Sequence, residues 1–215
     1  MENLKLKICG MKHPGNISEV AKLQPDYMGF IFYEKTPRYF ETKMPEIPSA
    51  IKKTGVFVDE EINIILERIK EQDLNAIQLH GEESAAFCYE LKTLLMETQV
   101  EIIKVFSVKD DFDFSLLEAY EPVVDYFLFD TKGKNKGGNG ITFNWKVLKN
   151  YPSEKPFFLS GGIGPEEVEA IQELKTYFEK NGQKDLLYAI DVNSKFEEEA
   201  GLKNIEKLKE FRKRL

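Results

Sequence analysis

The stretch Phe127-Leu128-Phe129-Asp130-Thr131 places three large apolar residues in a row and then a carboxylate. Strands of a parallel sheet are covered on both faces, so they are apolar at successive positions instead of alternating. The stretch therefore predicts a buried parallel strand that ends at Asp130. A similar run near the N-terminus leads into Lys-Ile-Cys-Gly at residues 7–10, where Cys9 is the functional group at the end of the predicted strand.

Runs of this kind recur along the whole chain, and segments with helical periodicity separate them. Between Ile62 and Ile69, for example, apolar residues stand at positions i, i+3, i+4 and i+7, which predicts an amphipathic helix. Pro165 suits the first turn of another helix. The eight predicted strands cover residues 4–9, 27–33, 54–58, 75–80, 100–106, 125–130, 156–160 and 186–191.

Eight strand and helix alternations in 215 residues predict an α/β protein that is a single (β/α)8 TIM barrel, with one domain over residues 1–215. A doubly wound open sheet is the structural alternative. In a barrel, the C-terminal ends of the strands meet at one mouth, and this mouth carries the chemistry. We therefore expect Cys9 and Asp130 to face each other there.

The composition limits the possible partners and the location of the chain. A net charge of −7 disfavours a nucleic-acid partner, and no apolar stretch is long enough for a membrane span. The N-terminus starts with a strand-like run and has no signal-peptide pattern, so we expect a cytoplasmic protein in which Cys9 and Cys88 are free thiols. His13 and His80 have no Cys or acidic partner at ligand spacing, so no metal site is expected.

Seven short segments, in their order along the chain, resemble the phosphoribosylanthranilate isomerase family. The resemblance runs from end to end and implies a cofactor-free Amadori rearrangement in tryptophan biosynthesis. The substrate would be N-(5-phosphoribosyl)anthranilate, and the product 1-(2-carboxyphenylamino)-1-deoxyribulose 5-phosphate. The matching segments are residues 7–10, 36–38, 55–58, 78–81, 129–131, 137–140 and 159–162.

The resemblance also implies roles for three side chains. Asp130 is the general acid that protonates the furanose ring oxygen, and Cys9 is the general base that then removes the proton from C2. Because the opened ring is an iminium that accepts electrons, the C2 proton is acidic enough to leave without a metal. Arg38 is expected to bind the anthranilate carboxylate, since a guanidinium matches a carboxylate with two hydrogen bonds.

The substrate phosphate is expected on two loops. Gly161 and Gly162 follow the seventh strand, and Asn193 and Ser194 follow the eighth, where barrels commonly hold phosphate. The second loop departs from the family, which usually has Asp-Val-Ser-Ser-Gly-Val-Glu where this chain has lysine, Lys195, at the glycine position. A lysine would be strained there if the loop required a positive φ.

Residues 132–140 are rich in glycine and lysine and follow the sixth predicted strand. We expect them to form a lid loop, in which Gly138 and Gly140 allow closure over the ligand and exclusion of water. His80 ends the fourth predicted strand beside Gly81. Either it contacts the substrate or it is a hydrogen-bonded structural residue, so it is left out of the catalytic pair.

The proposed mechanism places the proton on Asp130 and not on Cys9, which is opposite to the intrinsic acidities of the two groups. An unperturbed cysteine titrates near pH 8.5 and an aspartic acid near 3.9, yet the mechanism requires a thiolate beside a neutral carboxylic acid. Inverting the pair costs about 4.6 pKa units, or roughly 6 kcal/mol, unless a minor population reacts. A specific influence on Cys9 is therefore expected.

Three other functions remain open from the sequence. One is a histidine-pathway aldose-ketose isomerase, whose family uses two aspartates, so that Cys9 argues against it. Another is a non-catalytic sugar-phosphate-binding barrel, and the third is a redox-responsive protein with Cys9 as its sensor. We expect a monomer with a small-molecule substrate, and a homodimer is the alternative.

Overall fold

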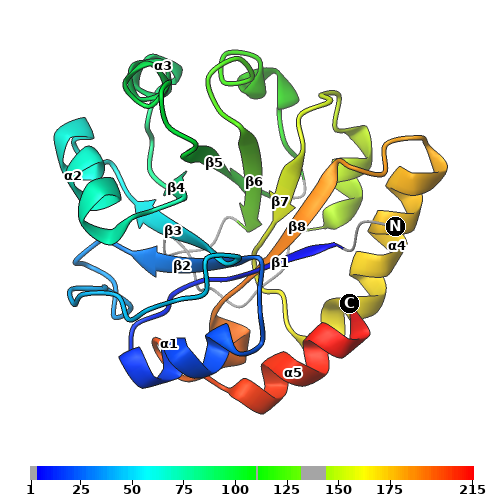
Figure 1. Cartoon of the computed structure of the whole chain (residues 1–215). Coiled ribbons are helices and arrows are strands. Elements are labelled where there is room, and N and C mark those ends of the chain that lie inside the picture. Colours follow the sequence, from blue (N-terminus) through cyan, green and yellow to red (C-terminus); the bar gives the residue numbers. More distant parts are fainter. Residues whose placement is uncertain (1–3, 110, 132–143) are drawn as a thin grey trace.

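The computed structural model describes residues 4–109, 111–131 and 144–215. It contains a closed barrel of eight parallel strands surrounded by helices, seen along the barrel axis in Figure 1. The strands are β1 Lys5–Ile8, β2 Tyr27–Ile31, β3 Lys52–Phe57, β4 Ala76–Leu79, β5 Glu101–Val108, β6 Tyr126–Thr131, β7 Phe157–Leu159 and β8 Leu187–Val192.

Pairing of the first and last strands closes the barrel. β1 pairs in parallel with β2 and with β8, and Lys7 stands opposite Asp191 in the second pairing. An open doubly wound sheet is thereby excluded, and the predicted (β/α)8 barrel is confirmed. Every predicted strand is present with bounds within two residues of the observed ones. The consecutive burial along β6 agrees with a strand that is covered on both faces.

The outer ring has fewer α-helices than the predicted eight alternations require. The described residues contain α1 Pro14–Ala21, α2 Ile62–Gln72, α3 Ala85–Leu94, α4 Val168–Lys180 and α5 Ile205–Arg214.

The prediction of a helix in every unit is wrong at the β2–β3 connection, which Figure 1 shows as a loop. Pro37, Pro45 and Pro48 interrupt this segment, and a proline both lacks an N–H donor and disfavours helical backbone in the preceding residue. A single 3-10 turn, η1 Phe114–Leu117, follows β5, and η2 Trp145–Asn150 precedes β7.

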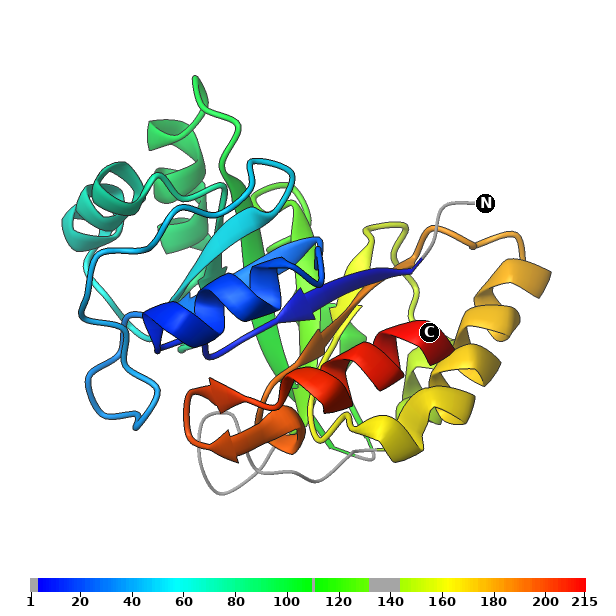
Figure 2. The ribbon, with the colours of Figure 1, turned by 60° about the horizontal axis from the view of Figure 1, so that its bottom comes forward.

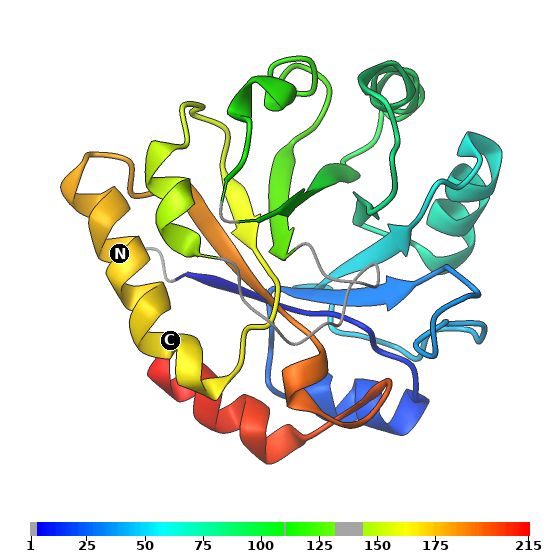
Figure 3. The ribbon, with the colours of Figure 1, turned by 180° about the vertical axis from the view of Figure 1, so that it is seen from behind.

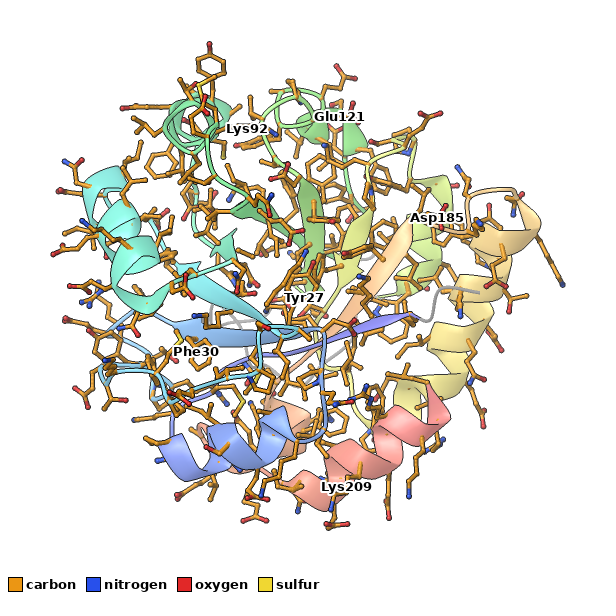
Figure 4. The ribbon with its side chains drawn as sticks, in the orientation of Figure 1. Tyr27, Phe30, Lys92, Glu121, Asp185 and Lys209 are labelled. Atoms are coloured by element: carbon orange, nitrogen blue, oxygen red, sulfur yellow. The ribbon has the colours of Figure 1, made fainter. Side chains whose placement is uncertain are left out.

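The apolar core has two parts. One fills the space between the strands and the helices, and the other fills the barrel itself. Figure 4 places Tyr27 near the middle of the barrel, whereas Lys92, Glu121, Asp185 and Lys209 lie at the rim. The interior cluster consists of Tyr27, Ala76, Ile103, Val105, Leu128, Phe158 and Ala189. These side chains fill the barrel toward the N-terminal ends of the strands, so the C-terminal ends of the strands are left for a binding site.

The chain beyond β8 covers one side of the barrel. It forms η4 Ser194–Phe196 and then a small hairpin, β9 Glu197–Glu199 and β10 Leu202–Lys203, which leads into α5 (Figure 2). α5 lies next to α4 on the outer ring (Figures 1 and 3), where Gln172 Nε2 donates to the carbonyl of Arg214 at 2.8 Å. Leu208 and Phe211 are buried beneath the basic residues of α5, so the basic side of this helix is its solvated face. No helix among the described residues is both long and apolar enough to cross a bilayer.

Candidate active site

A cavity of about 740 Å³, which includes its open mouth, lies at the C-terminal ends of the strands. The cavity brings together all of the predicted site residues that the structure describes, whereas Gly138 and Gly140 lie outside the described residues. The predicted residues that line it are Cys9, Arg38, Asp130, Gly161, Gly162, Asn193 and Ser194.

Cys9 sits directly after β1, and its position depends on a glycine in the neighbouring strand. Its backbone N–H donates to the carbonyl of Val192 at 2.9 Å. A Cβ added to Gly29 would stand 2.7 Å from Sγ of Cys9 and 3.1 Å from its Cα. Only glycine at position 29 of β2 therefore leaves room for the thiol at the cavity floor.

A buried ion pair lies beside the thiol. Side chains two residues apart on a strand share a face, so Lys7 and Cys9 both point into the barrel. Lys7 is fully buried; its Nζ donates to Oδ2 of Asp191 at 2.9 Å, and its charge interacts with the thiol of Cys9. Burial raises the pKa of the Cys9 thiol above its usual value, and the ammonium of Lys7 acts in the opposite direction.

The second predicted catalytic group, Asp130, is contacted from β4. Nε2 of His80 is 3.4 Å from Oδ2 of Asp130, and the backbone N–H of Thr131 donates to Oδ1 at 2.9 Å. The amide of Gln78 lies 3.1 Å from Nδ1 of His80. An amide nitrogen can only donate, so in this contact Nδ1 accepts and the ring proton is assigned to Nε2. His80 is thus held by Gln78 and lies beside the proposed acid.

Arg38 lines the cavity, but its fork is engaged by the protein itself. Nε donates to both carboxylate oxygens of Glu197, at 2.9 and 3.1 Å, and Nη2 donates to Oε2 at 2.6 Å. Lys203, also buried, donates to Oε1 of Glu197 and to Oδ1 of Asn193, both at 2.7 Å. Burial acts to raise the pKa of Glu197, but the bonds from Arg38 and Lys203 outweigh it and hold the pKa below its usual value. Both N–H groups of Nη1 and the second N–H of Nη2 make no hydrogen bond among the described residues, so they are left for a ligand.

The two predicted phosphate loops face the same cavity. Gly161 and Gly162 have φ angles of +91° and +68°, which favour glycine, and a Cβ on Gly161 would collide with Thr131. Lys195 is not among the residues with a positive φ, so the strain expected for a lysine at this position does not arise. Its side chain is exposed and lines the cavity.

Four residues of this network were missed from the sequence. Asp191 interrupts an otherwise apolar strand at the position near the end of a run that singled out Asp130, and Lys7 stands two residues before Cys9 in β1. These positions could have identified both. Glu197 and Lys203 belong to the hairpin after β8, for which the sequence carries no comparable indication. In the described part of the chain, no three His, Cys, Asp or Glu side chains are grouped so that they could hold a metal ion.

Comparisons with known proteins show the family to which the chain is similar. A family model described as N-(5'phosphoribosyl)anthranilate (PRA) isomerase matches residues 6–214. The N-(5'-phosphoribosyl)anthranilate isomerase of Parabacteroides distasonis is 42% identical over 213 residues, which are 96% of this chain and 90% of the relative. The enzyme of the same name from Campylobacter jejuni is 40% identical over 219 residues, with 99% and 98% covered.

Solved structures extend the similarity to the fold. A phosphoribosyl anthranilate isomerase in complex with reduced 1-(o-carboxyphenylamino)-1-deoxyribulose 5-phosphate has a TM-score of 0.75 and 27% identity, and covers 99% of this chain and 98% of that chain. A monomeric form of the dimeric enzyme from Thermotoga maritima has a TM-score of 0.70 and 27% identity, with the same coverage. Because the family model spans nearly the whole sequence and the relatives align over almost their full lengths, the chain belongs to the N-(5'-phosphoribosyl)anthranilate isomerase family.

Proposed function

We propose that Cys9 is the general base and Asp130 the general acid of this chain, which is an isomerase of tryptophan biosynthesis. The observation that supports these roles is their placement in one cavity, Cys9 after β1 and Asp130 near the end of β6. The same cavity carries a guanidinium and two glycine- or amide-bearing loops for the anionic ends of the substrate. One site thus holds the acid, the base and the binding groups that an aldosylamine phosphate requires.

The proton transfers follow from the bonds that must change. Asp130 gives its proton to the furanose oxygen as the bond from that oxygen to C1 breaks, which leaves an iminium at C1. The thiolate of Cys9 then takes the proton from C2, and the electron pair of the C–H bond forms the enolamine. When C1 gains a proton and the C2 hydroxyl loses one, the product is the ketose and the protein regains its original proton count.

The proton count also predicts how the resting site behaves. A thiol beside a carboxylate and a thiolate beside a carboxylic acid hold the same number of protons. Between the two pKa values, therefore, pH does not change the share of the reactive form; only the difference between the pKa values does. Burial raises the pKa of Cys9 and so lowers this share. A group that favours the thiolate is worth about tenfold in rate for each pKa unit.

The two ends of the substrate have separate partners in this proposal. Nη1 of Arg38 binds the anthranilate carboxylate, and Glu197 holds the rest of the guanidinium in place. The phosphate lies against the backbone of Gly161 and Gly162 and against Asn193 and Ser194. Lys195, which is exposed at the rim, adds a positive charge near this end.

Arg38→Ala is expected to raise KM for the substrate by about 10- to 100-fold, because a hydrogen bond to a charged group contributes roughly 1.5–3 kcal/mol. Arg38→Lys should raise it less, since the ammonium keeps the charge but loses the fork. Steady-state kinetics on both variants measures the difference. Arg68→Ala removes a cation that pairs with Glu71 outside the cavity and serves as the control. An unchanged KM for Arg38→Ala would exclude the carboxylate role.

Direct assay of two aldosylamines tests the reaction itself. The purified protein is expected to convert N-(5-phosphoribosyl)anthranilate and to leave the histidine-pathway aminoimidazole ribotide unchanged, because the cavity offers Cys9 where that family has an aspartate. Product formation is followed by chromatography for both compounds. Turnover of the histidine-pathway compound alone would refute the assignment, and turnover of neither would favour a non-catalytic binding barrel.

We further infer that the protein is cytoplasmic and monomeric. Its cysteines are both free and buried, which suits a reducing compartment. A permanent dimer buries a large apolar interface, and no unmistakable apolar patch is readable from the sequence. Since a relative from Thermotoga maritima is dimeric, a homodimer remains the alternative.

A further inference from the structure

Among the charged groups near Cys9, the ammonium of Lys7 has the strongest electrostatic effect on the thiol. Lys7 lies two residues before Cys9 on the same inward face of β1, and its side chain is 0% exposed. Asp191, which stands opposite Lys7 in the β1–β8 pairing, accepts a hydrogen bond from its Nζ, and Cys9 follows on the same face of the chain with its thiol buried beside this pair. The strand register therefore fixes all three groups relative to one another.

We propose that Lys7, anchored by Asp191, is a positioning residue that keeps a buried positive charge against the sulfur of Cys9 and stabilises its thiolate while the C2 proton is removed. This inference rests on the proposed role of Cys9 as the base. Lys7 itself neither touches the substrate nor transfers the C2 proton.

A second buried lysine shows what a purely structural pair looks like in this barrel. Nζ of Lys104 bonds Oε2 of Glu83 at 2.8 Å, and its remaining contacts are the backbone carbonyls of Gly81, at 2.7 Å, and Leu79, at 3.5 Å. All three donors of that ammonium are used by the scaffold. Among the described residues, Lys7 hydrogen-bonds only the carboxylate of Asp191 and no backbone carbonyl, and it shares its strand face with Cys9. Its charge is thus directed at a functional group instead of at the backbone.

The energetics of burial support the same conclusion. A buried ion pair adds little net stability, because desolvation of both charges offsets their attraction, and apolar side chains of the same volume often serve as well. In the Lys7–Asp191 pair, moreover, Oδ1 of Asp191 is buried and has no hydrogen-bond partner among the described residues. The fold alone does not account for the pair, whereas a thiolate beside Lys7 does.

Several charged groups surround the thiol, and the test must separate them. Lys7 and Lys203 favour the thiolate and Asp191 opposes it, with Lys7 the strongest of the three; burial outweighs them all. The groups and their elements are Lys7 from β1, Asp191 from β8, Lys203 from β10, Arg38 from the β2–β3 loop, and His80 and Asp130 across the cavity.

The experiment measures the thiol without substrate. In a Cys88→Ala background, which leaves Cys9 as the single thiol, the alkylation rate by iodoacetamide is followed by intact mass from pH 6 to 11. Lys7→Met is expected to move the midpoint up by one unit or more, at least a tenfold loss of thiolate at a given pH below the midpoint. Asp191→Asn is expected to move it down. Lys104→Met, which breaks the matched pair with Glu83, should leave it unchanged.

The same variants are then assayed for turnover. If the inference holds, kcat of Lys7→Met falls by about the factor by which its thiolate is reduced, while KM changes less. A midpoint in Lys7→Met equal to that of the parent, or an equal shift in Lys104→Met, overturns the inference. If Lys7→Met does not fold, Asp191→Asn decides, since an unchanged or raised midpoint there also overturns it. Failure of the proposed function is distinct, because it would appear as normal turnover in Cys9→Ala whatever the titration of the thiol.

Discussion

Cys9→Ala is expected to lower turnover by about 10²- to 10⁴-fold, the range that one positioned general acid or base contributes. Alanine has no group that accepts the C2 proton, and water in the cavity is a weaker and less well placed base. The barrel should remain intact, because alanine is smaller than cysteine and fits beside Gly29, whose missing Cβ already makes room for the sulfur. Asp191 also continues to hold Lys7 in this variant.

Turnover is measured with protein expressed in a host that lacks its own isomerase, so that traces of the host enzyme do not hide the loss. Cys88→Ala is the matched control, because it removes the other buried thiol, in α3, and should keep the parent rate. Cys9→Ser adds a further comparison, since a hydroxyl is a much weaker acid than a thiol and forms its anion less readily. Turnover within threefold of the parent in Cys9→Ala would exclude the base role.

Much of the barrel could be predicted because burial on both faces leaves consecutive apolar residues, a pattern that strands such as β2 and β6 carry. The helices were less predictable. The repeat of strands and helices predicts a helix in every connection. Pro37, Pro45 and Pro48, however, argue for a loop between β2 and β3, and a loop is what the structure has there. Local proline chemistry outweighed the repeat there.

The acid and base positions could be predicted because they stand at strand ends, and the closed barrel brings such ends together. Their supporting groups could not be assigned in the same way. The contact between Lys7 and Asp191 depends on the register of β1 against β8, and the grip of Glu197 on Arg38 depends on a hairpin that folds back beside the mouth. Neither follows from the order of residues along a single strand.

Asp130→Asn is expected to lower turnover by about 10²- to 10⁴-fold as well, because an amide has no acidic proton to give to the ring oxygen. The surroundings accept the change. With Nδ2 in place of Oδ2, the amide donates to Nε2 of His80, which then carries its proton on Nδ1. A flip of the Gln78 amide turns its Oε1, buried and unpartnered among the described residues, toward that proton. Both ring nitrogens of His80 keep a partner, and the Gln78 amide has one unpartnered atom after the flip as it has before, so the fold should be retained.

Asp125→Asn is the control for this variant. Asp125 directly precedes β6, accepts the backbone N–H of Ile102 at 2.7 Å and pairs with Lys92, so its replacement changes the opposite end of the same strand. It should lower the melting temperature and leave turnover unchanged. Asp130→Asn should instead keep the melting temperature and lower turnover. A turnover rate within threefold of the parent would exclude Asp130 as the acid.

Deuterium at C2 of the substrate separates the two roles, because only the step assigned to Cys9 breaks that bond. In Cys9→Ala, proton removal becomes the slow step, so deuterated substrate should react more slowly by a full primary isotope effect. In Asp130→Asn, ring opening precedes the C–H step and becomes limiting, so the isotope effect should approach one. Steady-state rates with protiated and deuterated substrate measure both ratios. The opposite assignment, with a large effect in Asp130→Asn and none in Cys9→Ala, would mean that the carboxylate is the base and the thiol the acid.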